Sequence, residues 1–140
     1  MKPMLAHKYS EDKVTYPCFV QPKLNGIRAL YCNGKFTSRD GHEFHPSVVK
    51  HITDRLINYP SDIILDGEFY RHGWPLQRIN AAVSVIRQTP NDDTKEVSFN
   101  VFDIAHVIMP IQMRIDSILC LPALEPEVCK VPAFIVENAD

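Results

Sequence analysis

The chain has 140 residues, which is room for one modest domain. Hydrophobic residues make up 45% and charged residues 23%, and these ordinary values exclude a disordered chain, a collagen or a coiled coil. The 15 basic residues nearly balance the 17 acidic ones, which argues against a protein that mainly coats nucleic acid. No apolar run approaches the ~20 residues of a membrane span, and the first ten residues lack the apolar core of a signal peptide. We therefore expect a soluble cytoplasmic protein without a membrane partner.

The N-terminal part of the chain predicts a short strand followed by a β-hairpin. Apolar residues crowd between turn formers over Cys18–Val20 and Ile27–Cys32, which is typical of strands. Asn33-Gly34 is a strong signal for a hairpin turn, and Lys35–Ser38 follows as the returning strand. The linker of residues 22–26 is too short for a helix, and its glycine permits an unusual backbone angle.

Helices and strands alternate over the rest of the chain. Apolar side chains at helical spacing predict helices, and continuous apolar runs predict strands. The expected elements are a helix from Pro46 that ends before Pro60, a strand over 62–70, a helix over 75–87, a strand over 97–104 and a short helix over 110–121. This alternation indicates an α/β or α+β domain with antiparallel strands and packed helices.

Four polar residues interrupt this pattern: Lys23 between two strands, Arg39 after the hairpin, Glu68 after an apolar run and Asp103 inside one. Taken singly, each is typical of a solvated turn or a strand end. Together they predict a reactive site, because partial desolvation and the nearby Arg28 can lower the pKa of a lysine amine from its usual ~10.4 and make the amine nucleophilic. Carboxylates on a neighbouring strand can hold a divalent cation or a ribose hydroxyl, and an aromatic ring beside them can stack on a base.

The same positions follow the order of a known set of motifs. ATP-dependent DNA ligases, with their capping-enzyme and RNA-ligase relatives, share a K-x-D-G-x-R signature, which residues 23–28 (KLNGIR) resemble. The family's S-R-x-G element is similar to residues 38–41 (SRDG), its D-G-E motif to residues 66–68, and its F-D-I motif to residues 99–104 (FNVFDI). One such motif alone matches many chains by chance, whereas four in order make a specific signal. The resemblance covers essentially the whole chain.

The resemblance implies a partial nucleotidyltransferase (ATP-grasp-like) domain that uses ATP and Mg²⁺. In this family a lysine attacks the α-phosphate of ATP, releases pyrophosphate and carries AMP as a phosphoramidate. Six residues match functional positions: Lys23 as the nucleophile, Arg28 and Arg39 as ribose or phosphate contacts, Gln21 at the adenine amino group, Glu68 at the ribose hydroxyl or the metal, and Phe102 stacked on adenine. Their chemistry suits these roles, because guanidinium forks fit phosphate and stacking contributes ~1 to 3 kcal/mol per base.

The chain departs from the family pattern in two ways. Asn25 replaces the usual aspartate, which keeps the geometry but loses a charge. The E-G and K-x-K motifs that follow F-D-I in the family, and the OB-fold after them, have no counterpart in this sequence. We therefore expect residues 1–140 to form the N-terminal part of a ligase-type adenylation domain, with the C-terminal motifs and the OB-fold absent.

Two explanations fit the missing motifs. The favoured one is half of a split ATP-dependent DNA ligase, which forms lysyl-AMP and seals nicked DNA in replication or repair with a second polypeptide that supplies the remaining motifs and the OB-fold. A split enzyme predicts an exposed apolar sheet edge near the C-terminus, where the partner pairs. The alternative is a non-catalytic remnant of a ligase that binds nucleotide or acts as a decoy. Within the family, the motifs also fit half of an RNA ligase.

Overall fold

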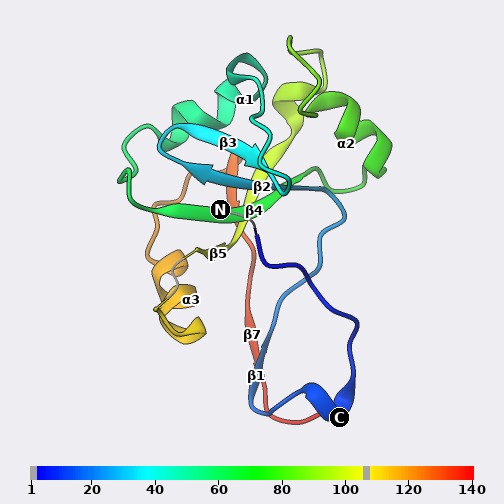
Figure 1. Cartoon of the computed structure of the whole chain (residues 1–140), viewed down its shortest axis with the longest axis vertical. Coiled ribbons are helices and arrows are strands. Elements are labelled where there is room, and N and C mark those ends of the chain that lie inside the picture. Colours follow the sequence, from blue (N-terminus) through cyan, green and yellow to red (C-terminus); the bar gives the residue numbers. More distant parts are fainter. Residues whose placement is uncertain (1–2, 106–107) are drawn as a thin grey trace.

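The computed structural model describes residues 3–105 and 108–140, and over these residues the chain forms two β-sheets and three α-helices (Figure 1). The larger sheet has the strand order β3-β2-β4-β5-β6, with β2 at Ile27–Cys32, β3 at Lys35–Ser38, β4 at Ile64–Tyr70, β5 at Ser98–Ile104 and β6 at Val128–Lys130. The smaller sheet pairs β1, Cys18–Val20, with β7, Phe134–Val136. None of the described helices is both long and apolar enough to cross a membrane. This mixed architecture is the fold class that the sequence predicts.

The first three strands have the bounds that the sequence predicts. Asn33 and Gly34 both have positive φ, at 48° and 82°, as a tight two-residue hairpin between twisted strands requires. Strands β2, β3, β4 and β5 pair antiparallel, as expected, whereas β5 and β6 are parallel. Strand β6, with three residues, is not among the strands that the sequence predicts.

Helix α1, Pro46–Thr53, begins where the proline predicts it, and the His45 side chain caps it by accepting a hydrogen bond from the Ser47 backbone N–H. The short 3-10 helix η2, Asp54–Leu56, continues it. Helix α3, Ile111–Leu119, also lies within its expected range. Two further 3-10 turns, η1 at Glu11–Lys13 and η3 at Thr94–Glu96, complete the elements.

Helix α2, Leu76–Ala82, is shorter than the helix expected over 75–87. It ends because Val83 leaves the helical conformation, with φ −142° and ψ 73°. Val83 is fully buried, whereas Ile86, which lies within the expected helix, is 84% exposed. Packing of the β-branched Val83 into the core therefore decides where the helix ends, against the helical periodicity of the sequence.

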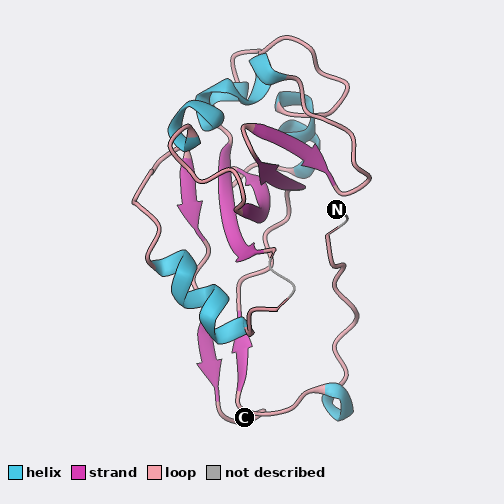
Figure 2. Cartoon of the chain, turned by 60° about the vertical axis from the view of Figure 1, so that its left-hand side comes forward, coloured by secondary structure: helices cyan, strands magenta, loops and turns pink. Residues whose placement is uncertain are grey.

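The hydrophobic core lies on one face of the larger sheet. Phe36, on β3, packs its ring against Phe69 and Phe99 at centroid distances of 5.0 and 4.8 Å. Successive side chains of a strand point to opposite faces, so the buried core residues Leu65 and Phe69 of β4 leave the acids between them on the other face. Figure 2 shows α1 and α2 at the same end of the molecule as the larger sheet, with the smaller sheet at the opposite end.

Candidate active site

A cavity of about 930 Å³ is bordered by the face of the larger sheet that carries these acids. Its volume falls within the ~300–1,000 Å³ usual for ligand pockets. Strands β2, β4 and β5, the linker between β1 and β2, the end of β3 and the start of α2 all contribute to the wall. All six residues singled out by the motifs line it: Gln21, Lys23, Arg28, Arg39, Glu68 and Phe102.

Strand β5 has a β-bulge at Phe102, in the cavity wall. Asp66 lies opposite Asp103 and Gly67 lies opposite Val101, so Phe102 is an extra residue without a partner on β4. The extra residue shifts the alternation of β5, and Ile104 rather than Asp103 is the next buried residue toward the C-terminus. Alternation from the buried Val101 puts the Phe102 ring on the cavity face, and the bulge keeps the carboxylate of Asp103 out of the core.

Gln21 holds the bulge in place from the linker after β1. Its Nε2 donates a hydrogen bond of 3.1 Å to the backbone carbonyl of Phe102. A bulged residue loses its place in the strand ladder, so a side-chain donor satisfies the carbonyl that the ladder leaves free. With Nε2 engaged in this way, the amide oxygen of Gln21 is the group that can accept a hydrogen bond from a ligand.

Asp66 orients Arg28 across the floor of the cavity. The guanidinium Nε and Nη2 of Arg28 donate to the two carboxylate oxygens of Asp66 at 2.7 and 2.6 Å, and its Cζ lies 4.7 Å from the centroid of the Phe102 ring. Burial raises the pKa of Asp66, and the hydrogen bond from Arg28 opposes this shift; the same hydrogen bond raises the pKa of Arg28. Asp66 is a positioning residue that the motif analysis missed, although it stands first in the D-G-E motif.

Glu68 faces the cavity from the same strand. Its Oε1 accepts a hydrogen bond of 3.3 Å from the backbone N–H of Gly26. A side chain at position 26 would overlap the backbone carbonyl oxygen of Phe69, so only glycine lets the linker approach β4 this closely. Burial raises the pKa of Glu68, while the Gly26 N–H and the charges of Arg28 and Lys23 oppose the rise.

Lys23 and Arg39 are exposed residues in the cavity wall. The sequence led us to expect partial desolvation of Lys23, and in the structure this lysine is an exposed residue of the short linker after β1. Its position is nevertheless on the same cavity as Glu68 and Phe102, not on the far side of the sheet. Asn25, which departs from the family pattern, is exposed and is not among the lining residues.

Asp103 does not reach the cavity wall. Its Oδ1 accepts a hydrogen bond of 2.8 Å from Nε of Arg114, on α3, and this ion pair fastens α3 to the end of β5. Three further polar residues do line the cavity: Ser38, Gln77 and Asn80. The last two lie three residues apart on the same side of α2.

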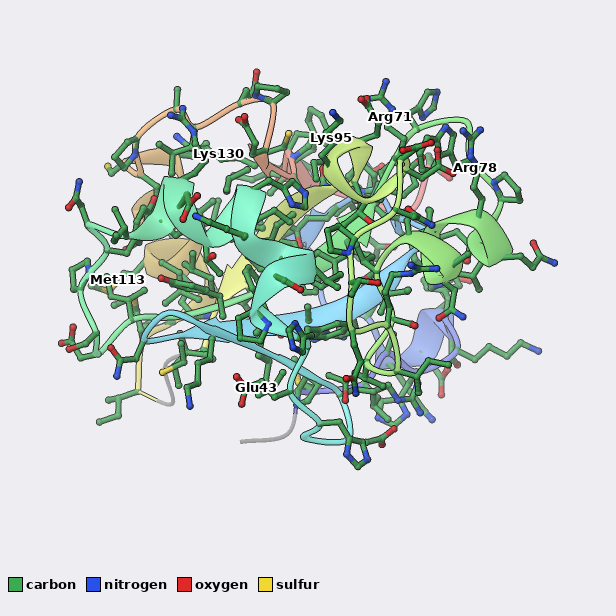
Figure 3. The ribbon with its side chains drawn as sticks, turned by 90° about the horizontal axis from the view of Figure 1, so that it is seen from above. Glu43, Arg71, Arg78, Lys95, Met113 and Lys130 are labelled. Carbon is green, nitrogen blue, oxygen red and sulfur yellow. The ribbon has the colours of Figure 1, made fainter. Side chains whose placement is uncertain are left out.

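Trp74 packs against the core, and its outer face carries a cation. The guanidinium of Arg78 stacks on the indole ring at 3.8 Å from the centroid and pairs through Nε with Asp93 at 2.8 Å. Figure 3 shows Arg78 at the periphery of the molecule. Neither Trp74 nor Arg78 lines the cavity, so this stack supports α2 rather than the site.

No group of three or more His, Cys, Asp or Glu side chains suited to a metal ion occurs in residues 3–105 and 108–140. Asp66 is engaged by Arg28, so Glu68 is the one carboxylate in the cavity wall that a cation could use there. Mg²⁺ commonly binds through one or two carboxylates together with substrate phosphates. The donor set therefore fits a cation that arrives with a nucleotide, and not a resident metal held by protein ligands alone.

Comparison with solved structures identifies the fold. One of the Lig E DNA ligases, described as binding DNA with a minimal scaffold, superposes with a TM-score of 0.76 at 19% identity, over 99% of this chain and 53% of that one. The Chlorella virus DNA ligase-adenylate superposes with a TM-score of 0.67 at 24% identity, over 100% of this chain and 52% of that one. The structure named Pmar-Lig_Pre superposes with a TM-score of 0.65 at 19% identity, over 91% of this chain and 33% of that one. The chain has a DNA-ligase-like fold.

This ligase-like chain spans about half the length, or less, of the structures it matches. A scan against protein-family models and a search of curated proteins gave no match. The similarity is therefore one of three-dimensional fold.

Proposed function

We propose that this chain is the N-terminal part of the adenylation domain of an ATP-dependent DNA ligase and that Lys23 carries AMP. The observation that supports this most directly is that all six residues matched to the ligase motifs line one cavity of nucleotide-compatible size. These residues come from three strands and two loops that are distant in sequence. A chance match of four motifs gives no reason for their side chains to meet at one cavity.

The cavity offers separate groups for each part of ATP. In the proposed complex, adenine stacks on Phe102, and the amide oxygen of Gln21 accepts from the adenine amino group, where guanine carries a carbonyl instead. Glu68 accepts from a ribose hydroxyl. Arg28, whose Nε and Nη2 are held by Asp66, contacts ribose or phosphate through Nη1, and Arg39 contacts phosphate.

The proposed reaction is a displacement at phosphorus. The lone pair of the deprotonated Lys23 Nζ attacks the α-phosphorus, the bond to the bridging oxygen breaks, and pyrophosphate leaves with that electron pair. Nζ loses its remaining extra proton to solvent, which reaches this exposed residue. Mg²⁺ bound with the phosphates supplies charge neutralisation, and Glu68 is the protein carboxylate proposed to hold it.

Nick sealing completes the proposed reaction. The AMP on Lys23 passes to the 5′-phosphate of nicked DNA, and the 3′-hydroxyl then displaces AMP. We propose that a second polypeptide supplies the E-G and K-x-K motifs and the OB-fold for these steps in replication or repair, in the cytoplasm, where ATP is available.

Covalent labelling tests the mechanism. The chain is incubated with α-labelled ATP and Mg²⁺, alone and with the unmatched half of the Lig E ligase as a separate polypeptide. We expect label on Lys23, loss of label in Lys23→Ala, retention in the matched surface variant Lys35→Ala, and weaker labelling by GTP. Label that survives Lys23→Ala, or no label under either condition, contradicts lysyl-AMP formation.

The exposure of Lys23 favours a second candidate, a non-catalytic nucleotide-binding remnant. The groups proposed for base and ribose, Gln21, Glu68 and Phe102, are held by hydrogen bonds or by the bulge, whereas the lysine is not enclosed. Titration with ATP separates the two functions, because a remnant binds ATP without covalent transfer whether or not the second half is present.

A further inference from the structure

The N-terminal segment, residues 3–9, forms part of the cavity wall although it belongs to no helix or strand. Figures 1 and 2 show it as an irregular trace that runs from the level of the larger sheet to η1 at the opposite end of the molecule. Among the described residues, no backbone hydrogen bond joins it to the rest of the chain. Two of its residues, Leu5 and Ala6, nevertheless line the cavity.

The side chains of this part of the segment are apolar and open to water. Met4 is 78% exposed and Leu5 is 49% exposed, and Ala6 is exposed as well. A single exposed apolar side chain is ordinary on a protein surface, whereas apolar residues that gather at a cavity are typical of a ligand site. Half-buried Leu24 and Ile27 continue the apolar wall of the same cavity.

The chemistry of ATP decides which part of it these residues can contact. The triphosphate is highly charged and the ribose carries hydroxyl groups, so the planar base offers the largest apolar surface. Burying the charged phosphates against apolar side chains is unfavourable, whereas burying the base against them is favourable. Leu5 and Ala6 therefore suit the base, for which Phe102 and Gln21 are the groups already proposed.

We propose that Leu5 and Ala6 close over the base of bound ATP, so that the N-terminal segment covers a part of the base that Phe102 leaves open. This assignment rests on the proposed function, because it takes the ligand of the cavity to be ATP. It makes Leu5 a residue that selects for a nucleotide base over a bare polyphosphate.

The segment has the freedom that such a closure needs. A hydrogen bond between the side chains of Tyr9 and Tyr16, which raises the pKa of Tyr16, ties the end of the segment to the chain just before β1. Residues 3–8 precede this tie and can adjust to a ligand. Ordering them on the base costs conformational entropy, so only part of the gain from burying Leu5 appears as affinity.

Titration calorimetry with two probes tests the assignment. One probe is α,β-methylene-ATP, in which carbon replaces the bridging oxygen so that no AMP passes to Lys23, and the other is tripolyphosphate, which lacks the base. In Leu5→Ser we expect the affinity for the analogue to fall about five- to tenfold, and the affinity for tripolyphosphate to change by about twofold or less.

Two variants control this comparison. Leu5→Met keeps the apolar volume and should stay within about twofold of the unchanged chain with both probes. Leu119→Ser, at a leucine that is 63% exposed on α3 and outside the cavity wall, should change neither affinity. In the complex of the unchanged chain with the analogue, the methyl protons of Leu5 should also show nuclear Overhauser contacts to the protons of adenine.

Three outcomes overturn the proposal: a Leu5→Ser variant that binds the analogue as tightly as the unchanged chain, an equal loss with both probes, or no Overhauser contact between Leu5 and adenine. The closure and the chemistry fail separately. Label on Lys23 from α-labelled ATP, together with an unaltered affinity of Leu5→Ser for the analogue, supports the function and contradicts the closure. A loss confined to the analogue, without label on Lys23, supports the closure and contradicts lysyl-AMP formation.

Discussion

At the scale of single residues, burial and pairing divide the cavity into a rigid and an open part. Asp66 is only 6% exposed and pairs with Arg28 through two hydrogen bonds, so its loss would leave a half-buried guanidinium without its carboxylate. Glu68 is restrained by the Gly26 N–H. Lys23 is exposed. The groups proposed to bind the base and ribose are thus preorganised, and the lysine is the group free to move toward a phosphate.

The ionisation of Glu68 makes the free energy of unfolding depend on pH, and the direction of this dependence follows from the pKa of Glu68. Burial raises this pKa above the ordinary value of 4.5, so the folded chain binds the proton more readily than the unfolded chain. The stability that Glu68 contributes is therefore present at low pH and lost as the pH rises through the raised pKa. Glu68→Gln should melt higher than the unchanged chain at pH 7, with a difference that shrinks toward pH 4.5.

Thermal unfolding followed by circular dichroism between pH 4.5 and 7 measures this difference. Glu137→Gln, at an exposed glutamate outside the cavity, is the control and should follow the unchanged chain at every pH. A Glu68→Gln advantage that grows as the pH falls would contradict the assigned direction.

At the scale of elements, close approach of strands shapes the site. The bulge at Phe102 begins beside Gly67. A Cβ at position 67 would overlap the backbone carbonyl oxygen of Asn100 and lie 2.7 Å from Cε1 of Phe99. The glycine of the D-G-E motif is therefore explained by strand packing.

Gly67→Ala should destabilise the chain by about 3 kcal/mol, because an added methyl group in a packed interior forces the strands apart. Gly73→Ala is the matched control: nothing lies within 4 Å of its Cβ position, so the variant carries only the cost of a side chain at a φ of 84°, about 1–2 kcal/mol. Urea denaturation measures both. Equal costs for the two variants would show that Gly67 is not tightly packed.

At the scale of the whole molecule, the two sheets differ in how much buried apolar packing stabilises them. The larger sheet packs Phe36, Phe69 and Phe99 into one buried aromatic cluster, whereas the smaller sheet exposes Phe134 and Ile135. Local stability follows buried apolar packing, so the two sheets should open at different free energies. The chain is therefore expected to be well ordered around the cavity and weakly ordered at β1 and β7.

Hydrogen exchange of the isolated chain measures this difference. Backbone amides of residues 18–20 and 134–136 should exchange at least ~100-fold faster than those of residues 29–31 and 65–69. Equal protection of both sheets would mean that the small sheet is stable without a partner.

Local alternation, turn chemistry at Asn33 and Gly34, and motif order were enough to predict the early strands, the hairpin turn, the start of α1 and the six residues that line the cavity. The end of α2 at Val83, the bulge at Phe102 and the pairing of Arg28 with Asp66 depend instead on tertiary packing. The exposure of Lys23 does so too. These features depend on residues far apart in the chain, and burial and strand pairing between distant segments leave no periodic signal in either segment alone.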